Sequence, residues 1–201
     1  MKSFEKALCR LSRAALLLGC LCLTAIHVGG ATFVVSNPND QGPGSLRQAV
    51  MDSNAQAGSN TIVFSRTGPT WILLWAGEIL VTNNVNIVGP GDELVVWGAQ
   101  QNSRIFHTVN AAVTISSMSI AHGSNFLGGG VLQEGGVLTL SNCFIGSNVA
   151  TFGGAIAQNN GTLRMTDCTV SSNSVGGTGM GIYIQGGSAT TTLRRCTMVG
   201  N

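Results

Sequence analysis

The chain has few charged and few aromatic side chains. Of its 201 residues, 9% are Asp, Glu, Lys or Arg and 5% are Phe, Trp or Tyr, with a single tyrosine. Soluble domains average about one-quarter charged residues, so Ser, Thr, Asn, Gln and Gly must cover most of this surface. The scarcity of charge argues against long charged helices and coiled coils. With 44% hydrophobic residues, the composition also excludes a disordered chain.

Lysine is absent after residue 6, so the net charge of residues 32–201 differs from that of the whole chain. Residues 1–31 hold four of the ten basic residues, so residues 32–201 keep six arginines against seven acids and a net charge of −1. Electrostatic binding to nucleic acid rests on several Lys or Arg contacts to phosphates. We therefore expect no nucleic-acid partner.

The first 31 residues have the order of a secretory signal peptide. Basic residues between Lys2 and Arg13 precede an apolar run over residues 14–26, and small residues follow. This order predicts export, and the run is too short to span a bilayer, which takes about 20 residues. Residues 17–20, Leu-Leu-Gly-Cys, also resemble a lipoprotein cleavage box, so ordinary and lipoprotein cleavage both stay open. We expect a mature chain without a transmembrane helix, secreted or at the cell envelope or outer membrane surface.

A repeat sets the expected fold. Three segments align without gaps on a central cysteine, at residues 138–148, 163–173 and 191–201. Met118 holds the same place in a weaker copy that begins at Val113, and the intervals between the four central residues are 25, 25 and 28. Fixed periods of 20–50 residues are typical of solenoids.

Each repeat contains two very short strands. Apolar residues alternate with polar ones, as at Leu138 and Leu140, and a second alternation follows after a polar pair, as at Cys143. Period-2 alternation indicates strands with one buried face, and glycine clusters then let the chain turn. Asn148 and Asn173 are expected to close the second strand as left-handed corner residues. The pattern predicts an all-β fold, a right-handed parallel β-helix.

Equivalent residues of successive coils should stack in columns about 4.7–4.9 Å apart. Two apolar columns are expected to point inward, Ile115, Leu140, Met165 and Leu193 in the first and Ile120, Ile145, Val170 and Met198 in the second. Cys143, Cys168 and Cys196 form a third inward column. Parallel stacking points their side chains the same way, which favours free thiols, although adjacent coils also permit a disulfide.

The N-terminal third differs in kind, because all four prolines and all three tryptophans precede residue 98. Ser45 with Gln48 three residues later fits a helix capping box. A solenoid needs an atypical end unit to shield its core, so residues 32–68 are expected to form a cap of strand, short α-helix and strand. Coils should then fill residues 69–201. They stop after the second strand of a repeat, which predicts an incomplete solenoid, a capping partner or self-association through the open coil.

Two motifs resemble known families. Residues 44–49, Gly-Ser-Leu-Arg-Gln-Ala, resemble the Cys-Ser-Leu-Arg-Glu-Ala (CSLREA-type) N-terminal region of secreted bacterial β-helix proteins, with Gly44 and Gln48 in place of Cys and Glu. Residues 153–156, Gly-Gly-Ala-Ile, are similar to half of the polymorphic outer membrane protein repeat. The other half, Phe-x-x-Asn, keeps its Asn but not its Phe, as at Ile145. The resemblance implies a β-helix at the cell surface or secreted.

A catalytic centre is not recognisable. Polysaccharide lyases and hydrolases on this fold need clustered acids, and beyond residue 105 only Glu134 and Asp167 remain, at non-equivalent repeat positions. His107 and His122 have no Ser or acid at a spacing typical of a catalytic group. We therefore expect no catalytic residue, no cofactor and no metal site.

Two groups of side chains are candidates for binding a glycan. The candidate residues are Arg164, Arg194 and Arg195, as a basic spot for anionic sugars, and Phe144 and Phe152, as a stacking surface. Arg195 and Asp167 hold the same slot in successive coils, so an ion pair between them is expected.

These features favour an exported structural or adhesion-type module that binds a surface polysaccharide or a host ligand. The alternatives are a polysaccharide lyase or hydrolase on a β-helix, and a passenger fragment of an autotransporter-like outer membrane protein.

Overall fold

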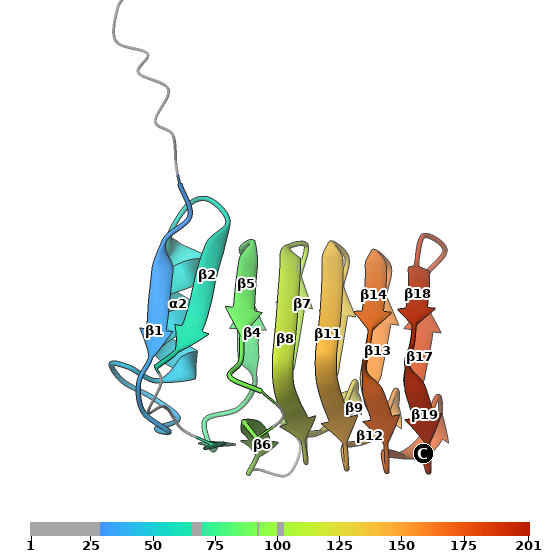
Figure 1. The fold of residues 1–201 in the computed structure, drawn as a ribbon. Helices are drawn as coiled ribbons and strands as arrows, with labels where there is room; N and C mark the ends of the chain where they lie inside the picture. Colours follow the sequence, from blue (N-terminus) through green and yellow to red (C-terminus); the bar gives the residue numbers. More distant parts are fainter. Residues whose placement is uncertain (1–28, 66–69, 92, 100–102) are drawn as a thin grey trace, which may run out of the picture.

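The computed structural model of the chain describes residues 29–65, 70–91, 93–99 and 103–201. Most of the predicted signal peptide, residues 1–28, lies outside these ranges. The chain winds into a parallel β-solenoid, in which strands from successive coils stand side by side along the molecule (Figure 1). The expected parallel β-helix with one short α-helix is confirmed.

The coils build three parallel sheets. The main path of sheet A, which has eleven strands in all, consists of β1 (Thr32–Val35), β2 (Asn60–Phe64), β5 (Val85–Val88), β8 (Ala112–Ala121), β11 (Val137–Gly146), β14 (Thr162–Thr166) and β18 (Thr190–Arg194). Its other strands are β3 (Trp71–Leu74), β6 (Val95–Gly98), β15 (Thr169–Ser171) and β19 (Thr197–Val199). Sheet B contains β4 (Ile79–Val81), β7 (Phe106–Val109), β10 (Val131–Glu134), β13 (Ile156–Asn159) and β17 (Ile182–Gln185). Sheet C contains β9 (Ser124–Leu127), β12 (Val149–Phe152) and β16 (Ser174–Thr178).

The two predicted apolar columns are confirmed by the strand register. Leu140 pairs with Ile115 of the coil before and with Met165 of the coil after it. In the same way, Ile145 pairs with Ile120 and with Val170. These side chains are fully buried in the middle coils. Cys143 and Cys168 are also buried, and both are free thiols, as their parallel stacking favours.

The corners of the coils differ from the prediction for Asn148 and Asn173. The left-handed residues are the serines just before them, Ser147 and Ser172, with φ of 56° and 57°. Asn148 instead points into the core, where its Nδ2 donates to the Ile120 carbonyl at 3.1 Å and its Oδ1 accepts from the Gly123 N–H at 2.9 Å. An amide both donates and accepts, so it satisfies backbone groups that the strands leave unpaired where they end.

The N-terminal unit begins with β1 and is covered by helix α2 (Leu46–Ala55). Ser45 is the N-cap of α2, and its side chain accepts a hydrogen bond from the Gln48 N–H at 3.1 Å, as the capping box predicts. Leu46 and Val50 bury one face of the helix. Strands β1 and β2 pair in parallel and β2 pairs with β5, so the unit continues sheet A of the coils.

Candidate functional site

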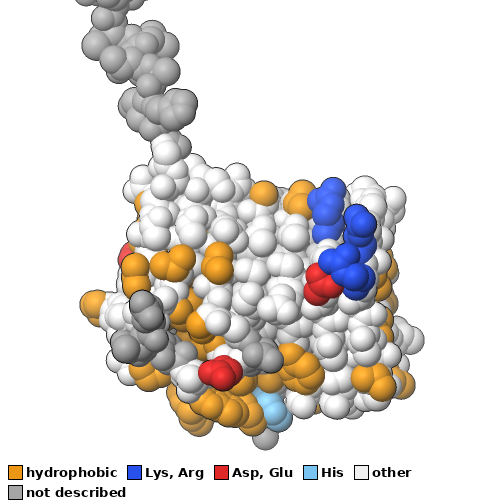
Figure 2. All heavy atoms as spheres, viewed as in Figure 1, with side chains coloured by type: hydrophobic (Ala, Val, Ile, Leu, Met, Phe, Trp, Pro, Cys, Tyr) orange, Lys and Arg blue, Asp and Glu red, His pale blue; other side chains and the backbone are white. Residues whose placement is uncertain are grey.

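Three arginines gather on the outer face of sheet A near its C-terminal end, where Figure 2 shows a cluster of basic side chains beside an acidic one. We call Arg164, Arg194 and Arg195 the arginine patch. Arg164 pairs in register with Thr192, and Arg194 lies two residues farther along the same strand. All three arginines are exposed, and neither Arg164 nor Arg194 forms an ion pair within the described ranges.

The third arginine of the patch forms the predicted ion pair between coils. Arg195 donates from Nε to Asp167 Oδ1 and from Nη2 to Asp167 Oδ2, each at 2.6 Å. These hydrogen bonds lower the pKa of the Asp167 carboxyl and raise the pKa of the Arg195 guanidinium. One acid thus offsets one of three cations, and the patch keeps a positive charge at neutral pH.

The two candidate phenylalanines lie on different sheets. Phe144 lies on β11, and its ring occupies the space where a side chain at position 146 would stand. Phe152 lies on β12 of sheet C, 5.5 Å from the Phe126 ring centroid and 5.1 Å from that of Tyr183. The structure therefore brings the arginines together, whereas Phe144 and Phe152 do not form one stacking surface.

A cluster of charged side chains that the sequence does not predict lies on the outer face of sheet B. We call Glu78, Arg104, His107 and Glu134 the carboxylate–histidine cluster. His107 Nδ1 is 2.9 Å from Glu78 Oε1, and His107 Nε2 is 3.0 Å from Glu134 Oε2. On the far side of Glu78, its Oε2 lies 2.7 Å from Arg104 Nε. The imidazole thus bridges two carboxylates that come from different coils.

The strand register explains how these residues meet. His107 on β7 pairs with Leu80 of β4 and with Leu132 of β10, and its neighbours Phe106 and Thr108 are buried. Alternation along β7 therefore turns His107 outward, between the two coils that supply the carboxylates. These contacts are not evident from the sequence, because Glu78 and Glu134 are 29 and 27 residues from His107. Both separations are close to one coil length, and this spacing is the sequence signal that indicates the two contacts.

Contacts within the cluster shift the pKa values of His107 and Glu78. The hydrogen bond to Glu78 is the main cause that raises the pKa of His107, with Glu134 adding to it, and desolvation opposes both. The hydrogen bond to His107 lowers the pKa of Glu78, assisted by the charge of Arg104. Both ring nitrogens of His107 are engaged, so the arrangement holds coils together and presents no unoccupied imidazole nitrogen to a substrate.

A second polar link ties the cap to the coil that carries Glu78. Arg47 of α2 donates to the backbone carbonyls of Gly77 and Glu78, each at 2.6 Å, and to Asp40 Oδ1 at 2.7 and 2.9 Å. Asp40 Oδ2 in turn accepts from the Trp75 N–H at 2.7 Å. The arginine of the Ser-Leu-Arg motif therefore has a structural role, which is to fasten α2 to the segment before β4.

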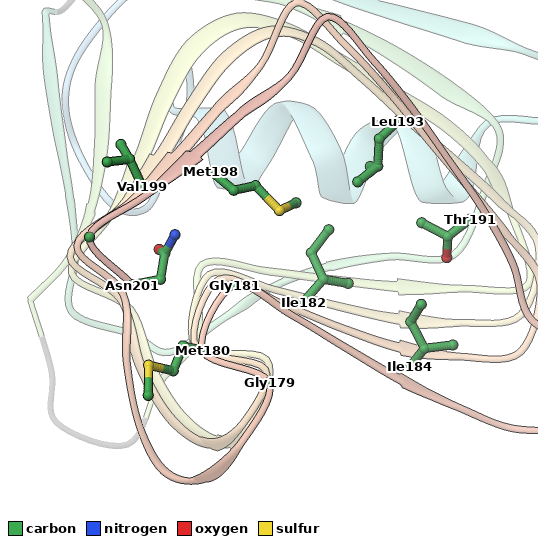
Figure 3. Close-up of a pocket in the computed structure, with 11 residues that line it drawn as sticks. Gly179, Met180, Gly181, Ile182, Ile184, Thr191, Leu193, Met198, Val199 and Asn201 are labelled. Carbon is green, nitrogen blue, oxygen red and sulfur yellow. The ribbon is translucent and has the colours of Figure 1, made fainter.

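The last described coil leaves a hollow of about 460 Å³ at its open face (Figure 3). Leu193, Met198 and Ile182 point into it from three strands of that coil. Leu193 and Met198 belong to the two apolar columns and are 43% and 44% exposed, whereas their equivalents in the coil before are fully buried. The hollow is the open cross-section of the core, and no charged side chain lines it.

Two other features are absent from residues 29–65, 70–91, 93–99 and 103–201. No group of three or more His, Cys, Asp or Glu residues there is arranged to hold a metal ion. In the same ranges no helix has the length and apolar character needed to cross a membrane. Comparison with known proteins finds no matching family model, no matching curated protein and no matching solved structure.

Proposed function

We propose that the protein is an exported module, secreted or displayed at the cell surface, that binds an anionic polysaccharide through the arginine patch. The observation that carries this proposal is the gathering of Arg164, Arg194 and Arg195 on one outer face, with a single acid, Asp167, paired to one of them. Guanidinium groups bind carboxylates and sulfates through paired, charge-assisted hydrogen bonds.

The surroundings of the patch suit an extended polymer. Parallel strands place Thr114, Thr139, Arg164 and Thr192 in one outward column of sheet A. Hydroxyls at a spacing of about 4.8 Å can follow successive sugar units, while arginine holds their acidic groups. Residues 32–201 carry a net charge of −1, so binding of a polyanion requires a local concentration of positive charge such as the patch.

Binding to alginate, polygalacturonate and heparin, measured by titration calorimetry, tests the proposal. The double variant Arg164→Ala/Arg194→Ala should raise the dissociation constant about tenfold or more, since a charge-assisted contact contributes roughly 1.5–3 kcal/mol. Added salt should weaken wild-type binding as well.

A matched control removes the same net charge elsewhere. Asn39→Asp/Gln41→Glu changes two exposed positions in the segment before α2 and also lowers the net charge by two. This control should bind like the wild type. Equal weakening in both double variants, or no binding to any of the three polymers, contradicts the proposal.

Export is tested separately by cell fractionation. The full chain should reach the envelope or the medium, and a chain without residues 2–31 should stay in the cytoplasm, because the basic and apolar segments are the export signal. Retention of the full chain in the cytoplasm would refute export but would leave the binding test untouched.

Polysaccharide cleavage is a second candidate, favoured by the two carboxylates that meet His107 on the outer face of sheet B. A substrate would have to displace one carboxylate from the imidazole before His107 could donate a proton to it. Product release from pectin or alginate that His107→Gln abolishes would establish this activity in place of binding alone.

A further inference from the structure

Polar contacts run without a break from the cap to the third strand of sheet B. Arg47 joins α2 to the carbonyl of Glu78, the side chain of Glu78 meets His107, and His107 meets Glu134. These residues come from α2, from the segment before β4, from β7 and from β10. The chain of contacts therefore crosses the cap and three successive coils at one face.

The bridge at its centre depends on one proton. An imidazolium has an N–H on each nitrogen, whereas a neutral imidazole has an N–H on one nitrogen and a lone pair on the other. With 2.9 Å to Glu78 and 3.0 Å to Glu134, only the imidazolium donates to both carboxylates. After the loss of the proton, one carboxylate faces a lone pair and loses its hydrogen bond.

We propose that the Glu78–His107–Glu134 bridge is a pH-dependent clamp, which fastens the coils of β4, β7 and β10 to one another while His107 is protonated and loosens when the proton leaves. The clamp does not depend on the proposed glycan binding, because the arginine patch lies on another sheet.

Few other charges face the imidazole. Glu78 and Glu134 flank it, Arg104 contacts Glu78 from the segment before β7, and Arg47 and its partner Asp40 lie on the cap side. Leu80 and Leu132, which pair with His107 on β4 and β10, do not titrate. Within the described ranges, the clamp is thus a set of two carboxylates, one imidazole and one guanidinium.

The direction of the effect follows from the raised pKa of His107. The stabilisation is complete below the ordinary value of 6.5 and is lost as the pH rises through the higher folded-state pKa. The contribution of His122 to stability has the opposite pH dependence. Burial lowers the pKa of His122, so its contribution grows as the pH rises toward 6.5.

The first experiment follows the imidazole rings of His107 and His122 by NMR while the pH of the purified protein is raised. His107 should titrate above 6.5 and His122, which stacks on Trp97, below it. Glu134→Gln removes one carboxylate and should move the His107 midpoint down without moving that of His122. A His107 midpoint at or below 6.5, or one unchanged in Glu134→Gln, overturns the clamp.

The second experiment compares thermal midpoints from pH 5.5 to 9. The wild-type midpoint should fall relative to that of His107→Gln as the pH rises, because only the wild type has a clamp to lose. His122→Gln is the matched control, and its thermal midpoint should still fall relative to that of His107→Gln as the pH rises. A constant difference between wild type and His107→Gln contradicts the proposal. If His107→Gln does not fold, the NMR titration of the wild type and Glu134→Gln still decides the question.

Discussion

The coils from β8 to β15 and the region from the cap to β7 share one buried apolar core, but they differ in how regularly their coils repeat and in their charged contacts. In the later coils, residues 25 apart pair in register and stack as apolar columns. Asn148, Asn173 and Asn201 form an asparagine ladder, in which the Nδ2 of Asn148 and of Asn173 donates to the Oδ1 of the next asparagine. In the earlier region the offset between neighbouring coils varies, for instance 27 between Leu80 and His107, and charged side chains make the links. The comparison teaches that a regular repeat stacks equivalent residues in every coil, whereas the irregular coils add specific charged contacts to the shared apolar core.

The largest expected effect concerns the apolar columns. Leu140→Ala truncates a side chain with 0% exposure and should lower the free energy of unfolding by about 2–5 kcal/mol, from lost transfer energy plus a cavity. Leu193→Ala changes the same column where it is 43% exposed, so its cost should be clearly smaller. Urea unfolding of the two variants measures both costs. Equal costs would contradict the argument that burial sets the cost at each position of the column.

The next effect tests the polar fastening of the cap. Arg47→Ala removes hydrogen bonds to two backbone carbonyls and leaves Asp40 without its ion pair, at side chains that are 12% and 10% exposed. Loss of a largely buried charged link should lower the free energy of unfolding by about 2–3 kcal/mol. Hydrogen exchange should show the first loss of protection in α2 and β4. A uniform loss over all coils would mean that Arg47 does not act locally.

A smaller cost is expected in the asparagine ladder. Asn148→Ala leaves the Ile120 carbonyl and the Gly123 N–H without their partner in a fully buried place, which should cost about 1–3 kcal/mol. Asn201→Ala acts on the partly exposed end of the same ladder and should cost less. A larger loss in Asn201→Ala than in Asn148→Ala would contradict the burial argument.

The smallest effect is expected at the exposed pair of Asp167 and Arg195. Solvent screens this pair, so Arg195→Ala should leave the urea midpoint unchanged within error. The pair still lowers the pKa of Asp167, so any contribution it makes should disappear as the pH falls below the ordinary value of 3.8. A clear destabilisation at neutral pH would show that this surface link acts like the buried ones.

Much of the fold could be predicted because the repeat is local and periodic. Alternation at Leu138 and Leu140 gave the buried face, and the fixed interval of 25 gave the register that the structure shows. Ser45 and Gln48 marked the start of α2 in the same local way. These features need no knowledge of distant contacts.

The carboxylate–histidine cluster could not be predicted in the same way. Glu78 and His107 meet because they are 29 residues, about one coil, apart, and no sequence repeat in this part of the chain fixes the offset of 27 between β4 and β7. The sequence predicts that Asn148 and Asn173 lie at the ends of strands, but it does not predict that their side chains point into the core. The side chain of asparagine suits both left-handed corners and buried contacts with backbone groups, and only the coil geometry distinguishes the two.

The most direct test of the account is a set of methyl–methyl NOEs in the folded protein. Stacked coils predict close contacts from Ile115 to Leu140 and from Leu140 to Met165, between residues 25 apart. If these contacts are absent and the same methyl groups instead contact sequence neighbours across antiparallel hairpins, the parallel solenoid and everything built on it are wrong.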